Sequence, residues 1–268
     1  MNDTLEWHQV NVSFPDWDSA EQTAATRLAP RLDGEAQVTA WWFIRKAPCW
    51  RVRYQASSSG AQPGVERHLG ELTAEGHLSG WTRVVYEPEF HAFGGPESMT
   101  AAHRLFHHDS RAILSYLHDQ PEGTHRREIS LLLCSVMLRA ARQDWFEQGD
   151  VWARVASYRK SPLGTLPQRP RLLAPVRRLV TADAESQMRD GMPLARCAGW
   201  AAAYAAAGEE LAGLAASGLL HRGLRDVLAH HVIFAWNRLG LHYATQTALA
   251  VTAKTVVFGP DPALAAAG

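Results

Sequence analysis

The chain has 268 residues, with 27 lysines and arginines against 27 aspartates and glutamates, so its formal net charge is zero. This balance gives no overall attraction to polyanions, which argues against nucleic acid and anionic membranes as partners. Three cysteines, Cys49, Cys134 and Cys197, are odd in number and widely spaced, so neither a disulfide framework nor a zinc site is indicated. No basic segment followed by an apolar run opens the chain, and no segment is apolar over the length of a membrane helix. We therefore expect a globular, cytoplasmic protein.

The first third of the chain has the pattern of a β-sheet. Apolar and polar residues tend to alternate over residues 5–86, which is the period of half-buried strands. Within this region a helix is predicted over Asp18–Ala29, capped by Asp16 or Asp18. The serine and glycine content of Ser57–Gly64 predicts an exposed loop.

From Ser98 onward the pattern is helical almost to the end. Asp150 is a candidate helix N-cap, and Gly218 and Gly240 are candidate helix ends. The alanine-rich segment Leu194–Ala216 has high helix propensity.

Strands in one part of the chain and helices in the other indicate an α+β fold, in which helices pack on a mostly antiparallel or mixed sheet. We expect one catalytic domain over residues 1–268. Its strand-rich half covers residues 1–95, its helical half covers residues 96–258, and a frayed tail follows at 259–268.

Several common catalytic motifs are absent. The sequence has no Gly-x-Gly-x-x-Gly, Walker loop, His-Glu-x-x-His or Gly-x-Ser-x-Gly, which argues against dinucleotide, nucleotide, zincin and hydrolase chemistry. His103 and His107 have the spacing of two metal ligands on a helix, but no third ligand accompanies them. We therefore assign no metal.

The segment Trp50-Arg51-Val52-Arg53-Tyr54 is the first candidate site. In a strand, its large apolar groups face one side and the two guanidinium groups face the other, about 7 Å apart. Such a pair would suit a carboxylate or peptide carbonyls. A sheet face open to water explains the pattern equally well, because arginine is usually exposed.

The second candidate is the segment from Tyr86 to Gly95, which joins a strand to a helix. It contains Glu87, Glu89 and His91. Catalytic side chains often lie on a connection of this kind, which rigid elements hold at both ends. In the following helix, Asp109 falls within an apolar stripe, so its carboxylate needs a partner or a function. A structural partner is the more common explanation for such a residue.

The third candidate is a helix over about Gly223–Leu239. Its apolar face takes in His231 and Arg238, while Asn237 and Tyr243 lie close in sequence. These groups would line a polar site, although a buried histidine is more often a satisfied core residue.

A basic segment lies between Val151 and Ala182, where no acidic residue occurs. Its seven basic residues are Arg154, Arg159, Lys160, Arg169, Arg171, Arg177 and Arg178. Such a segment forms a local basic surface that would suit an acidic peptide. A solvated loop balanced by acids elsewhere is the alternative.

Five sets of motifs, in order along the chain, resemble those of thiopeptide-type bacteriocin biosynthesis proteins, which are similar to the C-terminal elimination domain of lantibiotic dehydratases. The sets are Trp7-His8-Gln9-Val10, Trp42-Phe43-Ile44-Arg45 with Trp50-Arg51-Val52-Arg53, Tyr86-Glu87-Pro88-Glu89 with Gly94-Gly95, Phe106-His107-His108-Asp109-Ser110, and Trp236-Asn237-Arg238-Leu239-Gly240. The resemblance covers about residues 5–245.

The resemblance implies one of two reactions. Eliminases of this family remove glutamate from glutamylated serine or threonine, whereas pyridine synthases join two dehydroalanines in a formal aza-[4+2] cycloaddition. Eliminases typically have Glu-Arg-Tyr-Gly-Gly where this chain has His91-Ala92-Phe93-Gly94-Gly95, and a histidine found before Trp-Asn-Arg in the wider family is Ala235 here. Loss of these two polar groups favours the synthase. A non-catalytic subunit that binds the leader peptide is a further alternative.

The resemblance also implies roles for individual residues. The catalytic candidates are Tyr243 and Glu89, which would exchange the tautomerising proton, and Ser217 or His231, which would donate to the carbonyl oxygen. Arg51 and Arg53 would orient the peptide backbone, and Trp50, Phe93 and Trp236 would stack on thiazoles. The remaining substrate-binding candidates are Tyr86, Glu87, Asp109, Asn237 and Arg238.

The implied partner is a modified precursor peptide that carries a leader peptide. Arg169, Arg171, Arg177 and Arg178 are the candidates for leader binding, and dehydratase or azoline-forming enzymes are candidate protein partners. The cycloaddition, the loss of water and the release of the leader change no overall oxidation state, so no cofactor is expected.

Overall fold

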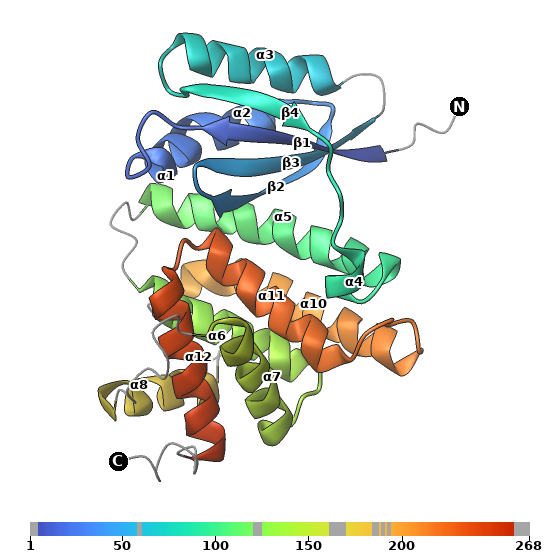
Figure 1. Cartoon of the computed structure of the whole chain (residues 1–268), viewed down its shortest axis with the longest axis vertical. Helices are drawn as coiled ribbons and strands as arrows, with labels where there is room; N and C mark the ends of the chain where they lie inside the picture. The colour runs from blue at the N-terminus through green and yellow to red at the C-terminus, as the bar shows by residue number, and fades with distance from the viewer. Residues whose placement is uncertain are drawn as a thin grey trace. The chain divides into compact units, whose positions relative to one another are not determined.

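The computed structural model describes residues 5–57, 61–119, 125–160, 170–183, 188, 191 and 194–259. The chain forms two compact units (Figure 1). The first consists of Met1–Pro88 with Phe106–Thr124, and the second of Glu89–Leu105 with His125–Gly268. The predicted tail after Gly259 lies outside the described residues.

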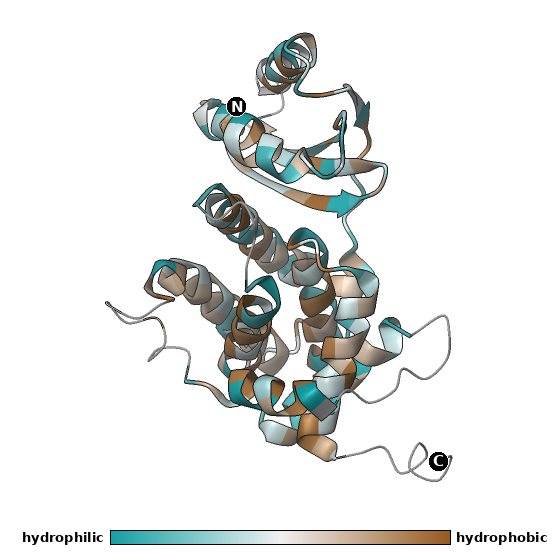
Figure 2. Ribbon diagram, turned by 90° about the vertical axis from the view of Figure 1, so that its left-hand side faces the viewer, coloured by the Kyte–Doolittle hydropathy of each residue, from teal (hydrophilic) through white to brown (hydrophobic). Residues whose placement is uncertain are grey.

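The first unit contains a four-stranded antiparallel sheet in the order β2-β3-β1-β4 (Figure 1). Its strands are β1 (Leu5–Ser13), β2 (Val38–Lys46), β3 (Cys49–Ser57) and β4 (Gly80–Val84). Val52 of β3 lies opposite Val10 of β1 and Phe43 of β2, and all three are buried. Figure 2 shows both hydrophobic and hydrophilic residues on the strands. In β2, however, a continuous buried run from Trp41 to Ile44 replaces the predicted alternation. The α+β fold class is confirmed.

Helices accompany the sheet earlier and more often than predicted. The segments α1 (Ala20–Thr23), η1 (Ala24–Leu28) and α2 (Ala29–Gly34) follow one another without a break, and η1 is a π-helix. Asp16 and Asp18 are not the N-cap: that residue is Ser19, and Asp16 instead accepts from the backbone N–H groups of Asp18 and Ser19 in the preceding turn.

A further helix, α3 (Ala61–Ala74), was not predicted and begins inside the expected loop Ser57–Gly64. Its buried residues Val65, Leu69 and Leu72 lie at helical spacing, and together they anchor the helix. The loop prediction is therefore wrong from Ala61 onward.

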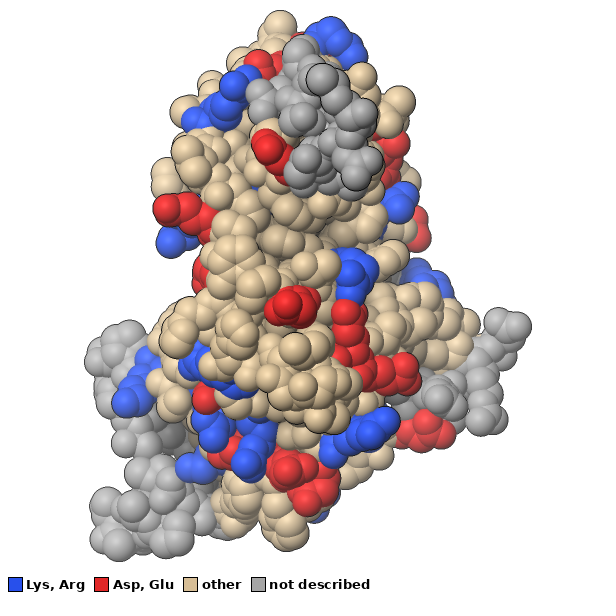
Figure 3. All heavy atoms as spheres, turned by 90° about the vertical axis from the view of Figure 1, so that its right-hand side faces the viewer, with Lys and Arg blue, Asp and Glu red and all other residues tan. Residues whose placement is uncertain are grey.

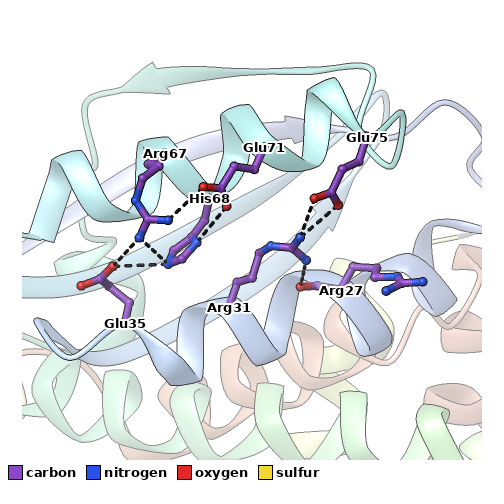
Figure 4. Close-up of polar contacts among 7 residues, drawn as sticks. All are labelled: Arg27, Arg31, Glu35, Arg67, His68, Glu71 and Glu75. Carbon is purple, nitrogen blue, oxygen red and sulfur yellow. Dashed lines mark hydrogen bonds and ion pairs between the residues drawn. The ribbon is translucent and has the colours of Figure 1, made fainter.

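Ion pairs join α2 to α3 along their solvent side (Figure 4). Arg31 donates to both carboxylate oxygens of Glu75 at 3.0 Å, and Glu35 lies 3.3 Å from His68 Nε2. A side chain on Gly64 would collide with the Glu35 carboxylate, so the glycine makes room for it. The more exposed pair, Arg31 with Glu75, should contribute only about 0–1 kcal/mol to stability.

The edge of β2 is covered by the part of α5 (Pro96–Asp119) that belongs to the first unit. Ser110 Oγ accepts a hydrogen bond from the Phe43 N–H at 3.2 Å, and His107 Nδ1 lies 3.0 Å from the Trp41 carbonyl oxygen. Side chains thus satisfy backbone groups that an edge strand otherwise leaves unpaired.

The second unit is helical. Its elements are α4 (Phe90–Phe93), the first part of α5, α6 (Arg126–Ala140), α7 (Trp145–Tyr158), α8 (Pro170–Thr181), η2 (Ala195–Cys197), α10 (Ala198–Ala216), α11 (Leu224–Arg238) and α12 (Tyr243–Phe258). The predicted helix ends at Gly218 and Gly240 are confirmed, since each glycine follows a helix with positive φ.

The predicted cap at Asp150 is wrong, because Asp150 lies within α7. The cap is Asp144, whose carboxylate accepts from the Glu147 N–H at 2.8 Å while the Glu147 side chain accepts from the Asp144 N–H at 3.0 Å. Among the helices of the described ranges, none is long and apolar enough to cross a membrane.

Candidate functional site

Arg53 of β3 packs against two neighbouring aromatic rings of the first unit. Arg53 is only 5% exposed, and its guanidinium carbon lies 4.2 Å from the Trp42 ring centroid and 5.1 Å from that of Tyr86. Its Nε donates to Gln9 Oε1 at 2.8 Å. The alternative of a water-exposed face is therefore wrong for Arg53. Arg51, two residues away on the same face, is only half-buried and is the more accessible guanidinium.

Three rings that were expected to stack on thiazoles are interior. Trp50 is stacked on Phe43 at 4.6 Å between centroids, and Trp236 on Trp152 at 6.1 Å. Trp50 and Trp236 are at most 1% exposed, and Phe93 is fully buried. Their packing within the unit does not support a direct contact with substrate.

Phe93 is the centre of the contact between α4 and α11. Its ring meets His231 and Phe234 edge to face, at 5.0 and 4.9 Å between centroids. The positive φ of Gly94 and Gly95 turns the chain sharply after Phe93, and the Gly94 carbonyl accepts from the His221 N–H at 2.9 Å.

Inward-facing polar residues predicted on two helices are indeed buried: Asp109, His231 and Arg238 are at most 1% exposed. Burial lowers the pKa of His231 to about 3, and the neighbouring Arg238 and His230 act in the same direction. The His231 ring is therefore neutral at neutral pH. Because it is also enclosed, His231 is poorly placed to donate a proton to substrate.

A polar cluster that the sequence did not predict surrounds the adjacent histidine, His230. Its Nδ1 lies 3.0 Å from the Asp226 carbonyl oxygen, and its ring meets Tyr158 of α7 at 5.0 Å between centroids. Arg222 Nη2 donates to the Tyr158 hydroxyl at 2.8 Å. Burial lowers the pKa of His230 and Arg222 lowers it further, while the Asp226 carbonyl and the Glu89 charge oppose this shift.

A second polar network joins α7, α11 and α12. Arg159 donates from Nε to Gln246 Oε1 at 2.7 Å and from Nη2 to Asn237 Oδ1 at 3.4 Å. Its guanidinium lies 5.5 Å from the ring of Tyr243, whose hydroxyl donates to the Lys160 carbonyl at 3.0 Å. The predicted neighbours Asn237 and Tyr243 thus belong to one network, connected by an arginine that had been assigned only to the basic segment.

Other predicted residues lie at exposed positions. Glu87 and Glu89 flank Pro88 ahead of α4, and Ser217 is the C-cap of α10. Tyr86, which borders Arg53, is half-buried.

The predicted leader-binding arginines are partly described. Arg171, Arg177 and Arg178 are exposed on α8, and Arg177 also donates to the Val256 carbonyl at 3.3 Å, whereas Arg169 lies outside the described residues. Positive and negative groups are intermixed on the face that Figure 3 shows. In the part of the chain that the structure describes, no three histidine, cysteine or acidic residues gather as a metal site.

Solved structures with a similar fold include the tRNA-dependent lantibiotic dehydratase MibB from Microbispora sp. 107891 and TsrL, each 17% identical, and the pyridine synthase TbtD from thiomuracin biosynthesis, 14% identical. Each has a TM-score of 0.66 and covers 94% of this chain. The chain in turn spans 28% of MibB, 94% of TsrL and 97% of TbtD. At these identities the likeness establishes the fold alone.

A comparison with curated proteins gives no match. The family model described as "Lantibiotic biosynthesis dehydratase C-term" matches residues 7–256, nearly the whole chain. The chain therefore belongs to the lantibiotic biosynthesis dehydratase C-terminal family.

Proposed function

We propose that the chain is a pyridine synthase of thiopeptide biosynthesis. It would join two dehydroalanines of a thiazole-containing precursor peptide in a formal aza-[4+2] cycloaddition and then release water and the leader peptide. Members of its family are biosynthetic enzymes, and TbtD, which shares its fold, has the name pyridine synthase.

The observation that carries this choice over glutamate elimination is the chemistry of α4. At the position where the resemblance to eliminases calls for an arginine that assists glutamate departure, this chain has Ala92. The next residue, Phe93, packs on the uncharged ring of His231 and on Phe234. Without that arginine, this position of α4 offers no guanidinium to bind the departing glutamate carboxylate.

The reaction begins with an amide that must change its form. The amide between a thiazole-bearing residue and a dehydroalanine tautomerises to an imidic acid, which completes a 2-azadiene. Two new carbon–carbon bonds to the second dehydroalanine then close a hydroxylated ring. Loss of water and expulsion of the leader as a carboxamide make this ring an aromatic pyridine.

Two physical effects would accelerate these steps. Holding diene and dienophile face to face can contribute about 7–11 kcal/mol in ideal cases. Acid and base groups that exchange the tautomerising proton typically contribute about 100- to 10,000-fold in rate. Positioning is therefore the larger effect.

Accessible residues of each unit supply groups for these tasks. In the first unit, the half-buried Arg51 is the proposed contact for peptide carbonyls, while Arg53 holds the neighbouring aromatic rings. In the second unit, the side chains of Glu89, Ser217 and Tyr243 are exposed and are the proposed hydrogen-bonding groups toward substrate. His231 is better explained as part of the packing around Phe93.

The test compares two substrates on the purified full chain, each followed by mass spectrometry. A thiazole-containing peptide with two dehydroalanines should be converted, and a glutamylated precursor should not lose glutamate. Glutamate loss instead would identify an eliminase. Inertness toward both, together with leader affinity, would identify a binding subunit.

A further inference from the structure

We infer that His230 and Tyr158, fixed by Asp226 and Arg222, form the acid–base pair that tautomerises the substrate amide. This inference deepens the proposed function and rests on it. Neither residue belongs to the sequence motifs of the family resemblance, and His230 is one position away from the histidine that the helix pattern selected.

The hydrogen bond of His230 fixes which of its nitrogens can accept a proton. A backbone carbonyl only accepts, so the 3.0 Å contact with the Asp226 oxygen requires the proton on Nδ1 in the neutral ring. The lone pair then lies on Nε2, for which the described residues offer no hydrogen-bond partner. The ring is half-buried, unlike His231, so Nε2 is available as a base.

The hydroxyl of Tyr158 has the complementary arrangement. It accepts a hydrogen bond from Arg222 Nη2 at 2.8 Å, which leaves its own proton free to be donated. Tyr158 is 38% exposed, so a substrate carbonyl can approach the hydroxyl. The guanidinium would stabilise the phenolate that forms when the proton leaves.

The step balances without any added reagent. The amide N–H proton passes to His230 Nε2, and the electron pair of that bond forms the C=N bond of the imidic acid. The former carbonyl π pair takes the proton of the Tyr158 hydroxyl. The imidazolium then returns its proton to the phenolate, which restores both groups, and the edge contact of the two rings, 5.0 Å between centroids, keeps them neighbours.

The charges around His230 fit a ring that changes its protonation state during turnover. Glu89 from the N-terminus of α4 and Asp226 favour the imidazolium, whereas Arg222 favours the neutral ring. Arg154 of α7 binds the Asp226 carboxylate at 2.7 Å, and the neighbouring His231 stays neutral. Glu89 thereby gains a supporting role: it stabilises the charged His230 instead of exchanging the proton with Tyr243.

The test measures kcat and KM of the full chain on the peptide with two dehydroalanines. His230→Gln and Tyr158→Phe should each lower kcat about 100-fold or more with little change in KM. The double variant should be no slower than the slower single variant, because both residues serve one step. His118→Gln, which alters an imidazole that is 61% exposed at the end of α5, is the matched control and should retain activity.

A pH profile separates proton transfer from a structural contribution. The wild-type rate should fall on the acid side as His230 becomes protonated, and this fall should disappear from the residual activity of His230→Gln. A His230→Gln protein within about threefold of the wild-type rate would overturn the inference alone. A wild-type protein inert toward this peptide would overturn the proposed function and the inference together.

A measurement that needs no turnover adds a further arm. Nitrogen-15 NMR of the imidazoles, with the His230 signal assigned from the variant, should show the Nδ1–H form. A ring protonated on Nε2 would overturn the inference whatever the activity, because that nitrogen would have no lone pair to accept the amide proton.

Discussion

The guanidinium carbon of Arg53 lies 4.2 Å from the centroid of the Trp42 ring. From the sequence alone, a water-exposed side chain explained this strand position equally well. The contact with Trp42 and the bond to Gln9 stabilise a buried cation in the middle of the sheet. Arg53→Ala should therefore reduce the free energy of unfolding by about 2–4 kcal/mol, the sum of a desolvated cation–π contact and an unpaired buried amide.

Urea unfolding of this variant beside Arg51→Ala checks the expectation. The half-buried Arg51 should cost less than about 1 kcal/mol. Equal losses in the two variants would show that the Arg53 contacts do not stabilise the sheet.

The neutral His231 should make stability depend on pH. Its pKa is about 3 in the folded state against 6.5 as its ordinary value, so below pH 6.5 the unfolded chain binds a proton that the folded chain does not. Stability is therefore full above pH 6.5 and falls at lower pH, by about 1.4 kcal/mol per unit. His231→Phe should remove about 2 kcal/mol of the difference in unfolding free energy between about pH 5 and neutrality. An unchanged difference would mean that His231 is hydrated in the folded protein.

The turn after α4 should tolerate no side chain. Gly94 has φ +83° and an added Cβ would lie 2.9 Å from Val227 Cγ2, so Gly94→Ala should cost about 1–3 kcal/mol. Gly213→Ala, in the exposed part of α10 with nothing within 4 Å, should instead stabilise by about 0.5–1 kcal/mol. Thermal unfolding of both variants measures the contrast, and two shifts of the same sign would contradict it.

The N-terminus of α7 provides a test of capping. Asp144→Ala removes the carboxylate that accepts from the Glu147 N–H, while the backbone N–H at position 144 can still donate to the Glu147 side chain. The change should cost about 1 kcal/mol. Asp150→Ala breaks only exposed ion pairs with Arg154 and Arg225, so its cost should be smaller. Chemical denaturation measures both losses in the free energy of unfolding. A larger loss for Asp150→Ala than for Asp144→Ala would contradict Asp144 as the stabilising N-cap of α7.

The exposed arginines of α8 are the proposed docking surface for an acidic leader. Reversing Arg171 and Arg178 to glutamate should weaken binding of a labelled leader peptide about tenfold, or about 1.4 kcal/mol, with a smaller effect at high salt. Fluorescence anisotropy measures this affinity. The control reverses Arg67 and Arg127, which are 57% and 60% exposed elsewhere. Equal affinity in the wild type, the α8 variant and the control variant would show that α8 does not bind the leader peptide.

Local patterns predicted the elements that have one clear period. The alternation in β3 and the apolar faces of α5 and α11 each fix an inward side, so Val52, Asp109 and His231 could be identified as inward-facing. The start of α3 was missed because its three buried anchors occupy a short segment next to serine and glycine residues. The N-cap at Asp144 was not predicted, although the sequence carries its signal, because Glu147 follows at the spacing of a capping box.

The candidate site was harder to predict, because its contacts join residues far apart in the chain. Periodicity selected His231 as inward-facing, but His230 acquires its chemistry from Tyr158, 72 residues earlier in the sequence, and from Arg222. In the same way, Trp50 and Trp236 were recognisable as large rings, whereas their covering partners Phe43 and Trp152 belong to other elements. The local sequence pattern predicts which side of a helix or strand faces inward, but it does not predict which residues of other elements contact that side.

The most direct measurement of the central claim is the product stoichiometry from a thiazole-containing precursor with two dehydroalanines, incubated with the purified chain and analysed by mass spectrometry. A pyridine synthase releases one leader carboxamide for each macrocycle, and the macrocycle is lighter than the substrate by that leader plus one water. This equimolar pair is the predicted result. An unchanged peptide, together with free glutamate from a glutamylated precursor, would contradict the account and identify an eliminase.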